Sequence, residues 1–264
     1  MTNRAVQSPD SVIRTLGLFS TSLGFDPRRL KFLLKLARFF REYRSFRRSG
    51  GQIKALFPIL SDYDEQAGQM SGHYFHQDLL VAKFVREAAP RRHVDVGSRI
   101  DGFVAHIATF RDIELIDIRP LAESVHPQIK FLQADMMQPT AALESIADSV
   151  SSLHALEHFG LGRYGDPINP QGHVTGFRNV AKLVEPGGKL YIGLPIGRAT
   201  EVFFNGLRIM DPAEPPTWFE DPTQFRLERF DYVDDAGDLH TLADPHAMPP
   251  LIHGCGIYSF RRTG

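Results

Sequence analysis

Short apolar runs alternate with helix-like segments through the last two thirds of the chain. Runs typical of buried strands occur in HVDV, which begins at residue 93, and at residues 113–120, 129–135 and 148–156. A helix-like stretch that begins at Gly176 leads through a Pro-Gly-Gly turn into a fifth run. Helical segments fit between most of these runs. This alternation predicts a parallel sheet whose strands are joined by crossover helices.

Two more strand-like runs occur near the C-terminal end without a helical pattern between them. They lie within residues 225–240 and 253–262 and are separated by a loop. A connection without a crossover helix favours antiparallel pairing. The sequence therefore predicts an α/β fold with a mostly parallel sheet that ends in an antiparallel strand pair.

The N-terminal third contains one strongly amphipathic helical pattern. Asp26 and Pro27 are the N-cap and first-turn residues typical of a helix start. From there to Arg48, apolar residues recur every three or four positions, mostly with basic residues between them. Residues 28–54 hold ten basic side chains and one acid, Glu42, which gives a local net charge of +9. Such a helix can lie on anionic lipid, dock a partner protein, or pack its apolar stripe on the main domain.

A second helical pattern covers about Tyr74 to Ala89, and Pro90 ends it. The length of 264 residues suits one α/β domain with an appendage. We expect an N-terminal helical extension over residues 1–89, part of which can fold over a bound cofactor as a lid. Residues 90–264 are expected to form the α/β domain.

Composition and charge limit the partners, the cysteine chemistry and the cellular location that we expect for the protein. Apolar residues make up 42% of the chain and 30 basic side chains nearly balance 31 acidic ones, so no general affinity for nucleic acid is expected. The single cysteine, Cys255, excludes both an internal disulfide and a cysteine-based zinc site. No apolar window approaches about 18 residues and no secretory core begins the sequence. We therefore expect a cytoplasmic protein, with any membrane contact peripheral and at the inner face.

The order of these elements resembles the class I S-adenosylmethionine-dependent methyltransferases over about residues 90–262. The motif HVDVGSRIDG comes first, an acid ends the second strand, and LVEPGGKLYIGLP comes late. Within that superfamily, GHYFHQDLLVA, DVGSRIDGFVAHI, SLHALEHFGLGRYGDP and FNGLRI resemble an uncharacterised bacterial family, DUF268. The broader resemblance implies a Rossmann-like methyltransferase fold and S-adenosyl-L-methionine as cofactor, whereas the closer one implies no particular substrate.

The resemblance implies a cofactor site at the ends of the first three strands. Gly97 would allow the tight turn after the first strand, and Asp95 would orient that turn or reach the methionine amino group. Asp117 is where the superfamily has the acid that binds the ribose hydroxyls, and Asp135 matches the acid near the adenine amino group. The full candidate set is Asp95, Gly97, Ser98, Arg99, Gly102, Asp117, Ile118, Asp135 and Met136.

The turn after the first strand departs from the superfamily pattern. Arg99 and Asp101 occupy positions where glycines are usual, and the next glycine is Gly102. Arg99 can crowd a cofactor or can bind its carboxylate through a bidentate fork. A glycine turn after a strand is also common in proteins that bind no nucleotide.

The segment that follows the fourth strand faces the transferred methyl group in the superfamily. Methyl transfer to oxygen needs a base, and His158 is the first candidate because histidine titrates near neutral pH. Glu157 would orient it or contact the cofactor, and His154 is a second candidate. The alternative is that Glu157 and His158 begin a helix and that His154 is a core residue.

Other residues are candidates for contact with the acceptor. Three of them lie among the glycines of the same loop, and four lie elsewhere; they are Arg163, Tyr164, Asp166, Tyr74, His76, Asn205 and Arg208. Metal binding by His154 and His158, or by His73 and His76, is also conceivable from their spacing. Surface or hydrogen-bonded histidines explain these positions more simply, so no metal is expected.

The sequence thus predicts a methyltransferase that uses S-adenosyl-L-methionine, with a hydroxyl of a small molecule or glycan precursor as acceptor. The alternative is a non-catalytic or non-methylating protein on the same fold, which acts as a scaffold or accessory factor in glycan biosynthesis. Arg99 and Asp101 favour the alternative. The polar loop at residues 156–167 favours the enzyme, because a scaffold has no evident need for it.

Overall fold

The computed structural model describes residues 32–65, 67–121, 126–138 and 141–263. By internal contacts the chain divides into two compact units, Met1–Gln69 and Met70–Gly264. The division precedes the helix at residues 73–88, so that helix belongs with the α/β unit and not with the N-terminal extension. No described helix is both long enough and apolar enough to cross a bilayer.

The first unit contains helix α2 (Leu36–Arg48) and a short turn, η2 (Asp62–Asp64). The predicted helix start at Asp26 lies outside the described residues. None of the residues of α2 is buried. Its one acid, Glu42, accepts hydrogen bonds from Arg38 Nε at 2.8 Å and from the Tyr63 hydroxyl. These contacts bring the segment that contains η2 back to the helix.

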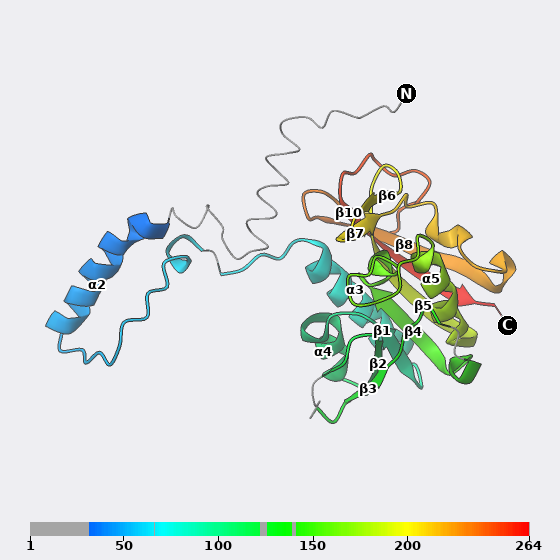
Figure 1. The fold of residues 1–264 in the computed structure, drawn as a ribbon, viewed down its shortest axis with the longest axis horizontal. Coiled ribbons are helices and arrows are strands. Elements are labelled where there is room, and N and C mark those ends of the chain that lie inside the picture. The colour runs from blue at the N-terminus through cyan, green and yellow to red at the C-terminus, as the bar shows by residue number, and fades with distance from the viewer. Residues whose placement is uncertain (1–31, 66, 122–125, 139–140, 264) are drawn as a thin grey trace. The chain divides into compact units, whose positions relative to one another are not determined.

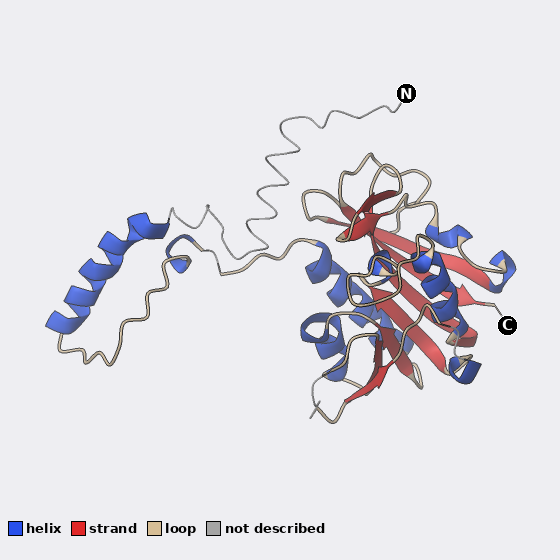
Figure 2. Cartoon of the chain, viewed as in Figure 1, coloured by secondary structure: helices blue, strands red, loops and turns tan. Residues whose placement is uncertain are grey.

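The second unit is built on a sheet of eight strands, in the order β3-β2-β1-β4-β5-β10-β8-β9 (Figures 1 and 2). The strands are β1 (His93–Val96), β2 (Ile113–Asp117), β3 (Ile129–Gln133), β4 (Ala147–Leu153), β5 (Val184–Ile196), β8 (Phe225–Val233), β9 (Leu239–His240) and β10 (Gly254–Arg262). β1 to β5 pair in parallel. β10 is antiparallel to both β5 and β8. The predicted parallel sheet with an antiparallel end is confirmed.

Helices cover both faces of this sheet, because successive strand residues point to opposite sides. The longer ones are α3 (His73–Ala88) and α5 (Gly172–Lys182), and the short α4 (Ala105–Ala108) follows the helical turn η3 (Ile100–Val104). One face packs against Val81 and Val85 of α3. The other packs against Phe177 of α5 and against Trp218. Each face therefore has its own apolar core.

Shorter elements complete the unit around this sheet. They are η4 (Ala141–Leu143), η5 (Leu156–His158), η6 (Pro215–Thr217), η7 (Pro222–Gln224) and the hairpin β6 (Glu201–Phe203) with β7 (Leu207–Ile209). The hydrophobic pattern did not predict this hairpin, because its strands are three residues long and all of β6 is exposed. It follows β5 and lies close to the turn η5, which helps to position the site described next.

Candidate functional site

A cavity of about 520 Å³ lies at the carboxyl ends of the parallel strands, the usual place for a ligand in such a sheet. We call it the strand-end cavity. It is lined by Val96, Gly97, Ile116, Asp117, Ile118, Arg119, Ala134, Asp135, Met136, Met137, His154, Ala155, His158, Phe159, Tyr164 and Asp166. Most of its lining residues are apolar, as is usual for small-molecule sites.

A buried carboxylate forms hydrogen bonds that hold the turn after β1 in place. Asp95 accepts hydrogen bonds from the Ser98 amide at 3.0 Å, from the Ser98 hydroxyl at 2.7 Å and from Ser151. Gly97 has φ of 74°, and a Cβ there would lie 2.8 Å from the Cβ of Ala155. Asp95 and Ser98 are buried beneath the turn and do not line the strand-end cavity, whereas Gly97 does. Asp95 thus orients the turn.

Asp117 lines the strand-end cavity, but its carboxylate is already engaged. Arg119 donates to it from the backbone amide at 2.8 Å, from Nε at 2.9 Å and from a terminal nitrogen at 2.5 Å. The same guanidinium lies over the ring of Tyr164, 4.6 Å from its centroid. Sequence reasoning missed Arg119, although its position two residues after the acid was the available signal.

Asp135 lies at the opposite side of the lining, after β3. Its carboxylate accepts a hydrogen bond from the Met137 amide at 2.9 Å. Met136 and Met137 are buried, and the Met136 carbonyl accepts from Asn179 at 2.9 Å. This segment gives the cavity an apolar wall with one carboxylate in it.

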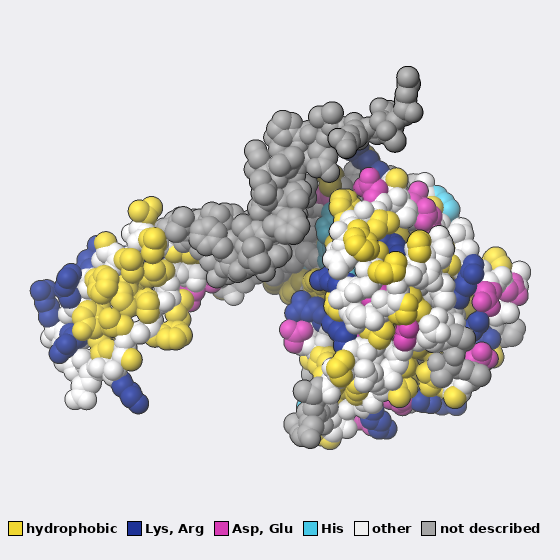
Figure 3. Space-filling view, viewed as in Figure 1, with side chains coloured by type: hydrophobic (Ala, Val, Ile, Leu, Met, Phe, Trp, Pro, Cys, Tyr) yellow, Lys and Arg dark blue, Asp and Glu magenta, His cyan; other side chains and the backbone are white. Residues whose placement is uncertain are grey.

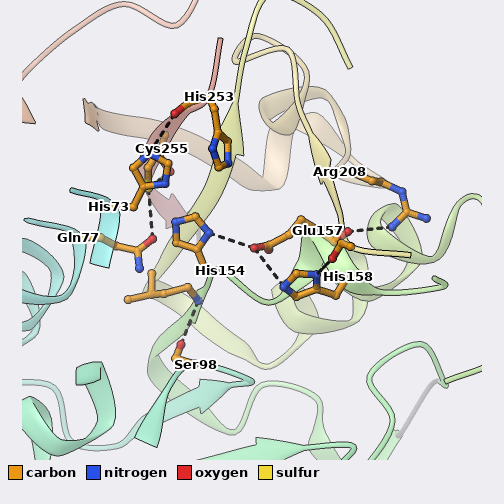
Figure 4. Close-up of polar contacts among 12 residues, drawn as sticks. His73, Gln77, Ser98, His154, Glu157, His158, Arg208, His253 and Cys255 are labelled. Carbon is orange, nitrogen blue, oxygen red and sulfur yellow. Dashed lines mark hydrogen bonds and ion pairs between the residues drawn. The ribbon is translucent and has the colours of Figure 1, made fainter. Parts of the chain in front are cut away.

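The loop at residues 156–167 is held in place by two charged side chains. Asp166 accepts from the amides of Gly160 at 2.7 Å and Tyr164 at 3.2 Å. The buried Arg208 of β7 donates to the carbonyls of Phe159 at 2.7 Å and Glu157 at 3.2 Å, as Figure 4 shows in part. Arg208 was predicted to contact the acceptor. It lines neither the strand-end cavity nor the second cavity described in the next paragraph, and its guanidinium contacts the loop.

A second cavity, of about 770 Å³ of open volume, adjoins the first. We call it the side cavity. It is lined by His73, Tyr74, Gly97, Arg99, Arg119, His154, Glu157, His158, Arg163, Tyr164, Pro195, Leu207 and His253. Five residues line both cavities: Gly97, Arg119, His154, His158 and Tyr164. A ligand in one cavity would therefore contact the same side chains as a ligand in the other.

Glu157 lies between two histidines at the junction of the cavities (Figure 4). Its Oε1 is 3.0 Å from Nδ1 of His154 and 3.6 Å from Nε2 of His158, and its side chain is 2% exposed. Nδ1 of His158 is 2.8 Å from the carbonyl of Gly206. The three predicted catalytic residues are therefore brought together by the turn η5 and the residues before it.

The pKa values of the two histidines shift in opposite directions. Burial lowers the pKa of His158, and the Glu157 carboxylate opposes this only in part. Burial would also lower the pKa of His154, but interactions with Cys255 and Glu157 outweigh it and raise that pKa well above its usual value. His158 is thus the histidine more readily neutral at physiological pH, as a general base must be.

The remaining predicted residues are divided between the side cavity and the surface. Tyr74 lines the side cavity beneath Arg99, whose guanidinium is 4.9 Å from the ring centroid and pairs with Asp101 at 2.9 Å. Arg163 lines it too and donates to the Gly206 carbonyl at 2.8 Å. Three more of the predicted residues line neither cavity, in addition to those described above. They are His76, Asn205, which is exposed, and Gly102. A Cβ at Gly102 would lie 2.6 Å from a carboxylate oxygen of Asp78, so close packing explains this glycine.

Sequence reasoning also missed two histidines of the side cavity as acceptor-side residues. His73 begins α3, and His253 directly precedes β10. Their rings are 5.0 Å apart, although they are distant in the sequence. No local pattern brings these positions together, because their proximity depends on the pairing of β10 with β5.

Comparison with known proteins is consistent with this architecture. Residues 107–215 match a family described as "Caenorhabditis protein of unknown function, DUF268". That description does not support the expected bacterial character of the family. No curated protein shows significant similarity to the chain.

Several solved structures with a similar arrangement of strands and helices are described as methyltransferases, and another is described as a [4+2]-cyclase. One is 1,6-didemethyltoxoflavin-N1-methyltransferase from Burkholderia thailandensis, with bound 1,6-didemethyltoxoflavin and S-adenosylhomocysteine. It has a TM-score of 0.50 and 12% identity, and the alignment covers 100% of this chain and 94% of that one. The chain has the Rossmann-like methyltransferase fold.

Two further structures align less closely. The N-methyltransferase NodS from Bradyrhizobium japonicum, in complex with S-adenosylhomocysteine, has a TM-score of 0.44 and 12% identity over 73% of this chain and 89% of that one. A methyltransferase-like protein from Bacillus halodurans has a TM-score of 0.48 and 13% identity over 70% of this chain and 99% of that one.

Replacement of Asp95 by Asn is expected to remove a pH-dependent loss of stability. Burial raises the pKa of Asp95 to about 7, although hydrogen bonds from Ser151 and Ser98 act to lower it. An unfolded Asp has a pKa of about 4, so its stabilising contribution is full below about pH 4 and is lost as the pH rises to about 7. The loss amounts to at most about 4 kcal/mol. In urea unfolding at a series of pH values, Asp95→Asn should gain stability relative to the parent across this range and then level off.

The difference between variant and parent isolates Asp95 from other titrating groups. Burial lowers the pKa of His93 to about 3 and that of His173 to about 4, so their contributions to stability rise with pH over the same range. Asp112→Asn, at an exposed position before β2, is the control and should differ from the parent by a constant amount. A constant difference for Asp95→Asn as well would contradict the prediction.

Proposed function

We propose that this chain is an S-adenosyl-L-methionine-dependent methyltransferase that methylates a hydroxyl group of a small molecule or glycan precursor. The observation that supports the proposal most directly is the junction of the two cavities. The strand-end cavity has the position of a nucleotide site. The side cavity meets it where Glu157 and His158 place acid and base groups. A donor in one cavity and an acceptor in the other would meet beside these groups.

The residues of the strand-end cavity fit the nucleoside part of the cofactor. Gly97 leaves the space that a Cβ would fill, and Ile118 and Met136 offer apolar contact to a purine ring. The Asp117 carboxylate can accept hydrogen bonds from the two ribose hydroxyls. S-adenosyl-L-methionine supplies a methyl group activated by its positively charged sulfur. S-adenosylhomocysteine is present in the structure of the Burkholderia thailandensis methyltransferase, which shares the fold.

Acid–base chemistry is assigned to His158 and Glu157. The carbonyl of Gly206 accepts a hydrogen bond from Nδ1 of His158, which leaves the lone pair on Nε2. That nitrogen lies at the junction of the cavities, where it can take the proton of an acceptor hydroxyl. Glu157, 3.6 Å away, stabilises the imidazolium that results. The hydrogen bond to Gly206 thus favours the tautomer of His158 that a general base requires.

Cationic and aromatic side chains give the side cavity its preference for an acceptor. Arg99 and Arg163 line it, and Tyr74 and Tyr164 provide ring faces beside them. Tyrosine rings contact the apolar faces of sugars and aromatic compounds, and guanidinium groups bind carboxylates and phosphates. An acceptor that combines a hydroxyl with an anionic group fits this lining. A phosphorylated glycan precursor is one such molecule.

One observation favours the alternative of a non-catalytic protein on the same fold. All of the Asp117 contacts described above come from Arg119, so the ribose hydroxyls would have to share or replace that ion pair. A scaffold or accessory factor would need no free carboxylate there. The two functions differ in whether the purified protein binds the cofactor.

Asp117→Ala is expected to weaken binding of S-adenosyl-L-methionine about 100-fold or more, because two hydrogen bonds to a charged group are lost at about 1.5 kcal/mol each. Isothermal titration calorimetry with S-adenosyl-L-methionine and S-adenosylhomocysteine measures the change. Asp112→Ala, before the other end of β2, is the matched control and should bind like the parent. Absence of binding by the parent at millimolar ligand would exclude the methyltransferase and favour the scaffold.

His158→Ala is expected to lower turnover about 10²- to 10⁴-fold, which is the usual contribution of a general base. Cofactor affinity should change little, because the assigned cofactor contacts come from other residues. Release of S-adenosylhomocysteine from a panel of hydroxylated acids, phenols and sugar phosphates gives the turnover. His246→Ala, on the surface, is the control. Turnover at the parental rate in His158→Ala would rule out this base.

We also propose that α2 binds anionic membrane surfaces. Phe39, Phe40 and Phe46 lie along one side of the helix, and Arg41 and Arg44 lie between them in the sequence. Figure 3 shows hydrophobic side chains gathered along α2 with basic side chains beside them. Phe46 is 57% exposed, and no residue of α2 is buried. An apolar stripe flanked by basic residues is the pattern of helices that lie at a lipid interface.

Replacement of both Arg41 and Arg44 by Glu is expected to reduce vesicle binding at least about tenfold, because each basic residue near an anionic surface contributes about 1 kcal/mol. Sedimentation with vesicles that contain phosphatidylglycerol, at low salt, measures binding. Arg86→Glu, in α3, is the control and should bind like the parent. Equal binding to neutral phosphatidylcholine vesicles, or no binding to either, would contradict the proposal.

A further inference from the structure

Three potential metal ligands converge on one point beside the side cavity. One ring nitrogen each of His73 and His154 and the sulfur of Cys255 all lie within 4.8 Å of one another. Figure 4 shows His73 above and beside His154, with Cys255 next to His73. The proposed methyl transfer uses neither His73 nor Cys255.

The pairing of strands brings these residues together. Cys255 of β10 pairs with Pro195 of β5, and the His154 amide donates to the Gly193 carbonyl of the same strand at 2.9 Å. Strand β5 therefore holds Cys255 on one side and His154 on the other. His73 is brought to the same place by the first turn of α3, which packs on this face of the sheet.

Both histidines are oriented by acceptors on their far sides. Nδ1 of His154 is 3.0 Å from the Glu157 carboxylate, and Nε2 of His73 is 3.1 Å from the His253 carbonyl. If each of these nitrogens donates, the lone pairs lie on Nε2 of His154 and on Nδ1 of His73. Metal-bound histidines almost always have such a carboxylate or carbonyl partner on the nitrogen that does not bind the metal.

The nitrogen of His154 left over by this arrangement has no partner of good hydrogen-bond geometry, and besides Glu157 the side chain that interacts with His154 is Cys255. Nε2 is buried, and the whole side chain is 5% exposed. A buried polar atom without a partner is costly, so its presence calls for a ligand. Cys255 is completely buried beside it, and its sulfur is 3.5 Å from Oε1 of Gln77.

We propose that His73, His154 and Cys255 bind one Zn²⁺ ion, with a fourth coordination position open to the side cavity. Two imidazoles and one thiolate are ligands that zinc prefers. His73 and His154 line the side cavity, so a water molecule or an acceptor group can reach the fourth position. Three protein ligands with one open position are typical of catalytic zinc.

Charge and distance at this point are compatible with the ion. A thiolate from Cys255 and the carboxylate of Glu157 together balance the two positive charges of zinc. Zinc bond lengths of about 2.0 to 2.3 Å place tetrahedral ligand atoms roughly 3.5 Å apart, so the side chains need to move by about 1 Å. Zinc would displace the proton of the Cys255 thiol when it binds.

The proposal differs from what the sequence led us to expect. The single cysteine was taken to exclude a cysteine-based zinc site, and spacing suggested the histidine pairs His154 with His158 and His73 with His76. The folded chain instead combines one member of each pair with Cys255. The site does not depend on methyl transfer, although its open position faces the cavity assigned to the acceptor.

The test is metal binding by the full chain after removal of metal by chelation and dialysis. Titration with Zn²⁺ against a chromophoric chelator should show one equivalent bound with release of protons, and Co²⁺ should give the absorption of a cobalt–thiolate bond. Cys255→Ser and His73→Ala should each weaken zinc binding at least about 100-fold, and Cys255→Ser should remove the thiolate absorption. His76→Ala is the matched control, one turn along α3 and outside both cavities, and should bind zinc like the parent.

A melting curve with and without Zn²⁺ separates loss of the site from loss of the fold. The ion should raise the Tm of the parent and of His76→Ala but not that of either ligand variant. Glu157→Gln, which removes the carboxylate behind His154, should weaken binding about 10- to 100-fold. The inference is overturned if the parent binds no stoichiometric zinc, or if the ligand variants bind it equally well. Binding of S-adenosyl-L-methionine is measured by calorimetry in a separate experiment. A negative result there would contradict the methyltransferase proposal without affecting the zinc result.

Discussion

A buried guanidinium supports the loop on which the candidate site depends. Arg208 is 2% exposed and donates to carbonyls of the segment from Glu157 to Pro170. Hydrogen bonds from a charged donor contribute about 1.5 to 3 kcal/mol each, and several carbonyls would be left without partners if the guanidinium were absent. Burial lowers the pKa of Arg208, and the charge of Asp166 opposes this. This side chain therefore helps to fix the positions of Glu157 and His158, and with them the junction of the two cavities.

The local hydrophobic pattern of the sequence was sufficient to predict most of the fold. Apolar runs and helical spacing predicted β1 to β5, α3 and the antiparallel pair, because burial on a sheet or helix face leaves a periodic trace. The same reasoning placed Asp117, Asp135 and Gly97 at strand ends, and these residues do line one cavity. It missed the hairpin of β6 and β7. Each of these strands is three residues long and all of β6 is exposed, so the hairpin has no clear hydrophobic pattern.

The site itself was predicted only where its residues are neighbours in the chain. His154, Glu157 and His158 lie within one short segment, so their convergence could be expected. Arg208 was assigned to the acceptor because a sequence cannot tell a guanidinium that faces a cavity from one that faces backbone carbonyls. Cys255 was set aside because a single cysteine was taken to exclude a zinc site, and its histidine neighbours are distant in sequence. Neither arrangement can be read from local sequence, since long-range contacts depend on the order in which strands pair.

The position of β5 between β4 and β10 has a consequence for how the protein becomes active. β10 is the last strand of the sheet along the chain, and it supplies Cys255 next to His253. Contacts between such distant segments form late, because a long loop must close before they are made. A chain still on the ribosome, with β10 inside the exit tunnel, could complete the parallel strands but would lack one wall of the side cavity. The side cavity is therefore completed only after this strand has been translated and has paired with β5.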